Sequence, residues 1–556
     1  MKRFAIIGGV LMAFLYTSCY EDKGNYEYHD INELVVNGIE SRYDRDVDDS
    51  LRIVPVIEGT MYSDTSRFTY SWEIGSSVVS QSHDLNIQID MTPGYKYSRY
   101  VVTDKETGIK TYKEFGVNVS SSTAGDMILV LSKYNGKAEL SYLRLDKENA
   151  NWAINYFESR NDYSLGNNPQ RLTICYTESA RNAPFVNRYG RVMVLADNVL
   201  QMVDKSTLMI DTLNQVLTAD DYLSQAVYPK PEIDGYKSEF AAEGISLWRS
   251  NAYGSGSQQS NNFIEISNGH LFAAASLAPS IWTTSYYYNV STPYEKGYLS
   301  PFGYWDDMSD TPNNNLKQMG YSLGNFIVFD RVHGRFAFAD SYGASIRSIE
   351  EADVKAFPGY TMRWGSATNR PDNGSIAVIE NGSESRIVML ADGTSSNNRA
   401  TKKLVGDISG GNIITGKSSF YMLKYGDNLF FSNERGIYRY NILNIASKVA
   451  PRESDKVFDL AKAGYDDSAV ITDIFVSRTE KTMLVAVSRY GSDIDGTGEP
   501  KGDLLWFNLD ASSGRLEYNA EKSYRGISGI PVDVQVKYQT HYRNGLNFNG
   551  VLMDNI

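Results

Sequence analysis

MILVLSKYNGKAELSYLRL, residues 127–145, contains the feature that decides the fold of most of this chain. An apolar run is followed by a polar turn at Asn135 and Gly136 and then by a second run of the same kind. Aliphatic β-branched and aromatic residues favour strands, whereas Gly and Asn favour tight turns. Consecutive apolar residues in both halves indicate strands that are covered on both faces. The stretch therefore predicts a buried β-hairpin.

The same pattern recurs along the rest of the chain. A β-meander that returns every ~40–50 residues is typical of propeller blades. Wider intervals in this chain imply loop insertions between blades. The predicted hairpins lie at residues 127–145, 191–204, 262–276, 325–340, 375–391, 421–442, 471–488 and 503–518.

We predict a β-propeller over residues 126–556, for which seven blades fit best and eight also fit. The apolar stretch at residues 532–538 is expected to complete the first or the last blade, because ring closure removes exposed sheet edges. A long β-solenoid is the structural alternative, but the repeats are too irregular in length for it. The chain shows no set of Trp-Asp dipeptides and no kelch double glycines, so the resemblance to propellers is architectural.

Residues 27–122 precede the propeller and read as a separate all-β domain. Short alternating strands separated by turn residues favour an immunoglobulin-like β-sandwich. Trp72 is expected to be its buried central aromatic residue. A stretch of small residues at 120–125 joins the two domains. The predicted strands of the sandwich cover residues 33–39, 51–59, 68–74, 84–90, 95–104 and 110–119.

The first 19 residues have the three-part layout of a secretory signal peptide. Lys2 and Arg3 precede an apolar stretch at residues 4–15, which is shorter than the ~20 residues that span a bilayer. The ending at Cys19 resembles a bacterial lipoprotein signal, which implies that residues 1–18 are removed and that Cys19 is acylated. Residues 19–26 would then form a polar tether. An ordinary signal peptide with a chance cysteine is the alternative.

Residues 19–32, CYEDKGNYEYHDIN, resemble the start of PKD-like-family lipoproteins of Bacteroidetes. The Trp-Glu strand at residues 68–74, the Tyr-x-Val-x-Asp strand at 100–104 and the strand at 115–119 resemble PKD-like modules as well. This resemblance implies an outer-membrane lipoprotein that faces the cell exterior beside SusC/SusD-type nutrient importers. Acidic Glu21 and Asp22 resemble an export tag for that surface, although they also suit a solvated leader.

The composition restricts the partners of the chain. A formal charge of −13 repels phosphate backbones and argues against nucleic-acid binding. Only two cysteines are present, so Cys175 has no intrachain disulfide partner once Cys19 is lipidated. Beyond residue 19 no uninterrupted apolar stretch is long enough to span a membrane, so the lipid is expected to be the sole anchor.

Motifs that carry chemistry are scarce. The five histidines form no His-Glu-x-x-His zinc motif, and no Gly-x-Ser-x-Gly elbow is present, so we assign no catalytic residue. We expect no cofactor. Asp493, Asp495 and Glu499 resemble fragments of a calcium loop but lack its third acidic position and its correctly placed Glu, so we expect a solvated hairpin tip there, with a loosely bound Ca²⁺ as the alternative.

One segment, residues 282–305, is a candidate for ligand binding because it holds nine aromatic residues in 24 positions. Exposed Tyr and Trp provide rigid contact area with a polar tip, and they are enriched in binding patches. The alternative is that these rings pack against the propeller as an internal cover. The candidate ligand-binding residues are Trp282, Tyr286, Tyr287, Tyr288, Tyr294, Tyr298, Tyr304 and Trp305.

The resemblance to PKD-like lipoproteins implies a non-catalytic accessory subunit that binds glycans or peptides, or helps to assemble an importer. A propeller enzyme of the glycoside hydrolase or lyase type is one alternative, because the fold alone does not determine function. A purely structural subunit is another. Two or more convergent acidic residues, or a metal, at the centre of the propeller would favour the enzyme.

Overall fold

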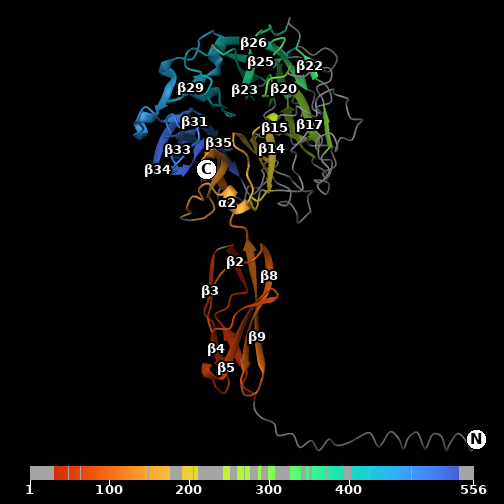
Figure 1. Cartoon of the computed structure of the whole chain (residues 1–556), viewed down its shortest axis with the longest axis vertical. Helices are drawn as coiled ribbons and strands as arrows, with labels where there is room; N and C mark the ends of the chain where they lie inside the picture. The colour runs from red at the N-terminus through yellow and green to blue at the C-terminus, as the bar shows by residue number, and fades with distance from the viewer. Residues whose placement is uncertain are drawn as a thin grey trace, which may run out of the picture. The chain divides into compact units, whose positions relative to one another are not determined.

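The computed structural model divides the chain into two compact units, Met1–Ser122 and Thr123–Ile556. Each unit is built almost entirely from β-strands (Figure 1). Among the described residues, no helix is long and apolar enough to cross a membrane. The structure describes residues 31–175, 191–210, 242–250, 260–275, 286–289, 298–306, 326–339, 346–349, 353–393 and 402–537, apart from isolated positions within these ranges.

Unit 1 is a β-sandwich, as the sequence predicts. Its larger sheet has the strand order β2-β9-β8-β5-β6, and two strand pairs, β1-β4 and β3-β7, complete the domain. The strands are β1 (Leu34–Asn37), β2 (Arg42–Asp46), β3 (Ser50–Ile53), β4 (Val56–Gly59), β5 (Phe68–Ile74), β6 (Ser77–Ser80), β7 (Leu85–Gln88), β8 (Gly94–Asp104) and β9 (Lys110–Ser120).

Trp72 lies at the centre of this sandwich, which confirms the role expected for it. Its side chain has no exposed surface, and its ring centroid is 4.2 Å from that of Tyr100. The indole Nε1 donates a hydrogen bond to the carbonyl oxygen of Ser82 at 3.0 Å. A buried Trp needs such a partner, so the ring is both packed and satisfied.

Two details of the sandwich differ from the prediction. The single strand expected over residues 51–59 is divided into β3 and β4, which join different strand pairs, with Pro55 between them. Proline has no N–H to donate to a ladder, so a break at this position is natural. The charged segment Arg42–Asp46, RYDRD, lies outside the predicted strands, but it forms β2 and pairs in parallel with β9.

Unit 2 is a β-propeller with seven sheets among its described residues. Figure 1 shows the sheets arranged around a common centre, with β23, β31 and β35 nearer to it than β22, β26 and β34. Short α2 (Phe157–Asn161) lies between the first two sheets in sequence. The sheets consist of β11 (Lys137–Arg144), β10 (Met127–Tyr134) and β35 (Ile530–Lys537); β12 (Pro169–Cys175), β13 (Arg191–Ala196) and β14 (Val199–Asp204); β15 (Ala242–Ser250), β16 (Ser260–Ser267), β17 (His270–Ala275) and β18 (Tyr286–Asn289); β19 (Tyr304–Trp305), β20 (Phe326–Asp330), β21 (Arg335–Ala339) and β22 (Ile346–Ser348); β23 (Thr361–Ala367), β24 (Ser375–Glu380), β25 (Ser385–Asp392) and β26 (Lys402–Ser409); β27 (Phe420–Met422), β28 (Asn428–Ser432), β29 (Gly436–Asn441) and β30 (Lys456–Asp459); and β31 (Val470–Val476), β32 (Thr482–Ser488), β33 (Gly502–Asp510) and β34 (Arg515–Ser528).

The last strand of the chain joins the first sheet of the propeller. β35 pairs antiparallel with β10, so the sheet that opens unit 2 is completed by its C-terminal strand. This confirms that the stretch near residues 532–538 completes the first blade. Eight predicted hairpins yield seven sheets because the hairpins at residues 471–488 and 503–518 belong to one sheet, β31-β32-β33-β34.

Five sheets of unit 2 share an irregularity in one edge strand, which is β12, β15, β23, β31 or β35. In each of them the register with the neighbouring strand shifts by one residue at a corresponding position. Such a shift is a β-bulge. The residue that follows the bulge is therefore in an equivalent place in all five blades. These residues are Arg171 in β12, Gly244 in β15, Trp364 in β23, Asp473 in β31 and Asp533 in β35.

Candidate functional site

Most of the aromatic residues that the sequence selects lie outside what the structure describes in atomic detail. Cys19, Trp282 and Tyr294 are outside the described residues. The backbone of Tyr286, Tyr287 and Tyr288 forms β18, which pairs with β17, and Trp305 lies in β19, which pairs with β20.

Two members of the set have described side chains, and they differ. Tyr298 is partly exposed, and its ring centroid is 5.3 Å from that of His333. Tyr304 is only 4 % exposed, and its hydroxyl is 3.1 Å from the hydroxyl of Ser375. Burial raises the pKa of Tyr304 well above its usual value. Tyr304 therefore packs as part of the core, as the internal-cover alternative proposes for this segment.

In the loop that resembles a calcium site, Asp493 and Asp495 form hydrogen bonds and an ion pair with other groups of the protein. Asp493 accepts hydrogen bonds from the backbone N–H groups of Asp495 and Thr497, both at 2.9 Å, and from the Thr497 hydroxyl at 2.7 Å. Asp495 pairs with Lys133 at 3.2 Å. Within the described part of the chain, no group of three or more His, Cys, Asp or Glu side chains is placed to hold a metal ion.

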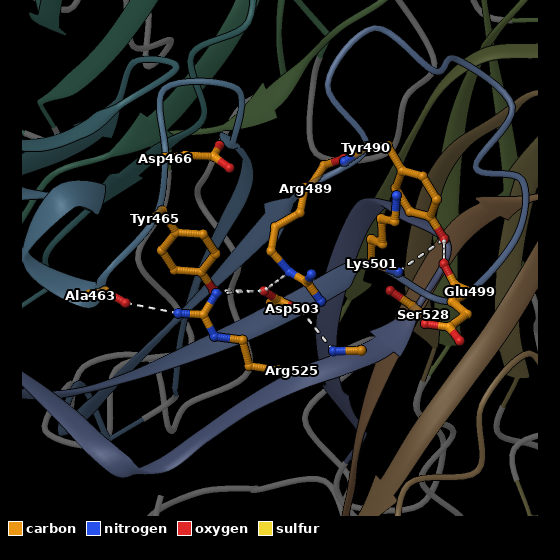
Figure 2. Close-up of polar contacts among 12 residues, drawn as sticks. Ala463, Tyr465, Asp466, Arg489, Tyr490, Glu499, Lys501, Asp503, Arg525 and Ser528 are labelled. Atoms are coloured by element: carbon orange, nitrogen blue, oxygen red, sulfur yellow. Dashed lines mark hydrogen bonds and ion pairs between the residues drawn. The ribbon is translucent and has the colours of Figure 1, made fainter.

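A polar cluster of the propeller lies at one end of the sheet β31-β32-β33-β34. Asp503 is the second residue of β33, and Val487 is its partner on β32. Arg489 follows the end of β32, Arg525 lies near the end of β34, and Tyr465 follows the 3₁₀ turn at Leu460–Ala463. Antiparallel pairing brings these segments to the same edge, although they are far apart in sequence (Figure 2).

Asp503 is the centre of this cluster and has no exposed surface. Its carboxylate accepts hydrogen bonds from Nε and Nη2 of Arg489 at 2.7 and 3.0 Å, and from the Tyr465 hydroxyl at 2.9 Å. The backbone N–H of Gly526 donates a further bond at 2.7 Å. A buried carboxylate is stable only when it is paired and its lone pairs are used, and both conditions are met here.

The cations around Asp503 extend to the surface. Arg525 Nη1 lies 3.4 Å from Asp503, and its guanidinium carbon lies 3.8 Å from the centre of the Tyr465 ring. The side chains of Arg489 and Arg525 are 33 % and 47 % exposed. Lys501 is also exposed and stands 5.8 Å from the centre of the Tyr490 ring. We call Arg489, Lys501 and Arg525 the cationic surface.

Around Asp503 itself two arginines face one carboxylate. Arg489 and Arg525 share the single carboxylate of Asp503, and Lys501 adds a further charge. Asp466 and Glu499 border the cluster in Figure 2. Asp466 accepts bonds from the backbone and hydroxyl of Ser468, and the hydroxyl bond does most to hold its pKa below the usual value. Guanidinium and ammonium groups are the side chains that bind carboxylates and other oxyanions.

A second polar feature joins neighbouring blades through their edge strands β31, β35 and β12. Asp473 of β31 accepts a hydrogen bond at 2.9 Å from the backbone N–H of Val534 in β35. Asp533 of β35 does the same at 2.9 Å for Leu172 in β12. These N–H groups belong to edges that have no further strand in their own sheet. Each carboxylate therefore accepts a hydrogen bond from one backbone N–H at the open edge of the next blade.

The surroundings of Asp473 and Asp533 favour their neutral forms. Burial is the main cause, and it raises the pKa of both side chains. The negative charge of Asp533 raises the pKa of Asp473 further, whereas Arg171 opposes the shift at Asp533. Two acids therefore occupy equivalent positions in consecutive blades, with the cation Arg171 in the next blade.

Asp473→Asn is expected to stabilise the protein more at pH 7 than at pH 4. An acid with a raised folded-state pKa holds its proton more tightly when folded, so rising pH weakens folding from the unfolded pKa of about 4 up to the folded value. Asn retains an oxygen for the Val534 N–H but carries no charge. The difference in unfolding free energy, variant minus wild type, should rise by up to ~1.4 kcal/mol per pH unit across that window.

Chemical denaturation at several pH values measures this difference. The control is Asp466→Asn, because the pKa of Asp466 is lowered and its charge stabilises the folded state above the unfolded pKa. That variant should become relatively less stable as pH rises. A difference for Asp473→Asn that does not change with pH would contradict the proposed environment.

Comparison with known proteins gives one family relationship and several architectural likenesses. Residues 19–169 match the PKD-like family, a region that covers the described sandwich and the segment up to the start of β12. No curated protein matches the chain significantly.

Two solved structures illustrate the architectural likenesses. A quinonprotein alcohol dehydrogenase-like protein from Bacteroides thetaiotaomicron is 12% identical, with 91% of this chain and 99% of that chain covered and a TM-score of 0.42. PorZ, a bacterial surface component of the type-IX secretion system of Porphyromonas gingivalis, is 11% identical, with 77% of this chain and 44% of that chain covered and a TM-score of 0.30. Likenesses of this strength assign no activity to the chain.

Proposed function

We propose that this protein is a non-catalytic, lipid-anchored subunit of the outer surface whose propeller binds carboxylate-bearing ligands. The observation that carries the proposal is the cationic surface, Arg489, Lys501 and Arg525, on a chain with a net charge of −13. The carboxylate beneath it is buried and committed to its own hydrogen bonds. An exposed cationic cluster on an acidic protein favours local recognition of an anionic group.

The place of action is proposed from the sequence together with the family match. The signal-like segment ending at Cys19 supports a lipid anchor, and the match of residues 19–169 supports a PKD-like stalk module. We infer that the protein is held at the outer membrane, faces the exterior and serves a SusC/SusD-type importer as an accessory binding or assembly subunit. Its ligand would be an acidic glycan or an acidic peptide, since the two present the same carboxylate chemistry.

One observation favours the alternative that the propeller is an enzyme. Asp473 and Asp533 both have raised pKa values, and the charge of Asp533 contributes to the shift at Asp473, as is typical of paired carboxylates in a glycoside hydrolase or lyase. Both carboxylates accept backbone hydrogen bonds from the adjacent blade. This use favours a structural role and supports binding over turnover.

The Arg525→Ala and Lys501→Ala double variant is expected to bind carboxylate polymers about tenfold more weakly than the wild-type chain, because it removes two exposed cations and leaves Arg489 to hold Asp503. Affinity electrophoresis with polygalacturonate and with poly-glutamate measures the loss and distinguishes a glycan from a peptide ligand. Lys417→Ala, which removes an exposed lysine elsewhere, should bind as the wild type does. Binding should weaken as salt increases.

The same incubations test the enzyme alternative. Binding without new polymer chain ends supports an accessory role, whereas chain ends that form with the wild type but not with Asp473→Asn would select the enzyme. Equal binding by the double variant and the wild type, or retention by neither polymer, would contradict the proposed role of the cationic surface.

A further inference from the structure

The outer face of the larger sandwich sheet exposes three tyrosines. Tyr95 and Tyr97 lie on β8 and are 48 % and 81 % exposed, and Tyr112 on the neighbouring β9 is 50 % exposed. Tyr97 lies opposite Gly116, and Tyr112 lies opposite Val101, so the register places all three on the face away from Trp72. Exposed tyrosines gathered on one sheet face mark a contact surface more often than a single exposed apolar residue does.

The Tyr95 side chain lies over a glycine of the neighbouring strand. A side chain at Gly116 would place its Cβ 2.1 Å from the Tyr95 hydroxyl oxygen, so the missing side chain leaves room for the Tyr95 ring across β9. The Tyr95 and Tyr97 rings are 5.0 Å apart at 82°. Tyr112 lies opposite Val101, which is four residues beyond Tyr97 on β8. Tyr97 and Tyr112 are therefore separated by ~13 Å along the strands.

Polar groups flank the rings and are paired with one another. Arg99 bonds to Glu73 at 2.5 Å, and its guanidinium carbon lies 5.4 Å from the centre of the Tyr112 ring. Arg42 pairs with Asp44 at 2.6 Å, and the Asn118 amide donates to the same carboxylate at 2.9 Å. Each of these arginines is therefore paired with a carboxylate, and Glu114 and Lys110 on β9 add one exposed charge of each sign to the same face. We call the three tyrosines with these flanking residues the tyrosine platform.

We propose that the tyrosine platform binds a neutral polysaccharide. The electron-rich faces of aromatic rings attract the C–H groups on the face of a sugar ring, and rings ~13 Å apart contact several sugars of one chain. Paired Arg, Asp and Glu side chains supply donors and acceptors for sugar hydroxyls, and their charges cancel. A stable protein partner would require about 800 Å² with an apolar centre depleted in charge, which three tyrosines among ion pairs do not provide.

This site lies in unit 1 and does not depend on the cationic surface proposed for the propeller. The two sites also differ in how their charges are paired, because each arginine of the platform has its own carboxylate, whereas Arg489 and Arg525 share Asp503. Loss of Arg525 and Lys501 should leave neutral polysaccharide binding unchanged, so the two proposals fail separately.

Affinity electrophoresis of the full chain in gels containing xyloglucan, galactomannan or dextran tests the platform. At least one polymer should retard the wild-type chain, and Tyr97→Ala with Tyr112→Ala should weaken that retardation at least about tenfold. Tyr97→Phe with Tyr112→Phe keeps both rings and should bind as the wild type does. Val35→Ala is the matched control, because Val35 is 54 % exposed on β1, outside the larger sheet.

Three outcomes would overturn the proposal. They are no retardation of the wild type by any of the three polymers, equal retardation of the Ala double variant, and loss of binding in the Phe double variant. Unfolding curves of the Ala and Phe double variants should coincide, because both tyrosines are at the surface, and this comparison separates loss of binding from loss of fold.

Discussion

A chain that ends at Gly529 is expected to lose the cooperative unfolding transition of unit 2. This truncation removes β35, which pairs with β10 over the length of the first sheet. Buried Val534 and Val536 pack against Ile128 and Val130 of β10 and against Leu484 and Leu504 of the last sheet in sequence. Without them the first and last sheets lose their shared core, and the exposed edge of β10 becomes available for aggregation.

The appropriate comparison is a chain that ends at Lys537, because it retains β35 and every other described strand. Thermal unfolding followed by circular dichroism and calorimetry should give a sharp transition for this chain and a broad or absent one for the chain ending at Gly529. The sandwich has its own core around Trp72 and should still unfold cooperatively in both. Identical transitions for unit 2 in the two truncations would show that β35 does not close the ring.

Asp503→Ala is expected to lower the free energy of unfolding by about 3 kcal/mol. The change removes the acceptor for Arg489, Tyr465 and the backbone N–H of Gly526 at once. Breaking a buried ion pair by removing one partner is costly because the remaining polar groups stay desolvated. Partial exposure of Arg489 and Arg525 lets water take over some of their hydrogen bonds, which keeps the expected loss at the lower end of the usual range.

Urea denaturation measures this loss, and Glu517→Ala provides the control because Glu517 is an exposed acid on β34 of the same sheet. The control should change the free energy of unfolding by about 0.5 kcal/mol or less. A loss for Asp503→Ala as small as that of the control would mean that the cluster does not support the end of this sheet. The cationic surface would then lack the fixed foundation that we infer for it.

Local patterns explain why the fold could be predicted. A hairpin such as residues 127–145 can be predicted from two apolar runs on either side of a Gly and Asn turn, and this pattern spans fewer than twenty residues. The pairing of β35 with β10 has no such local pattern, because β10 lies some four hundred residues earlier in the chain. Only the requirement that the ring of sheets should close predicts this pairing. The eight predicted hairpins agree with the favoured count of seven blades because the last two of them, in β31 to β34, form a single sheet.

The candidate sites depend on long-range pairing and were not visible in the sequence. The partners of Asp503 come from separate segments, and only the pairing of β32, β33 and β34 brings them together. For the tyrosine platform, a strand was predicted over residues 95–104, but the pattern did not show which aromatics face out. Tyr97 is 81 % exposed and Tyr100 is completely buried on the same strand. Only the position of Trp72 identifies the inner face.

Purification of the full-length protein from native outer membranes, with identification of what accompanies it, tests the proposed function most directly. The account predicts that the wild-type chain carries a lipid on Cys19 and is recovered with SusC/SusD-type importer proteins, whereas Cys19→Ala is lost from the membrane fraction. Recovery of the wild-type chain alone, or equal retention of Cys19→Ala in the membrane, would contradict it.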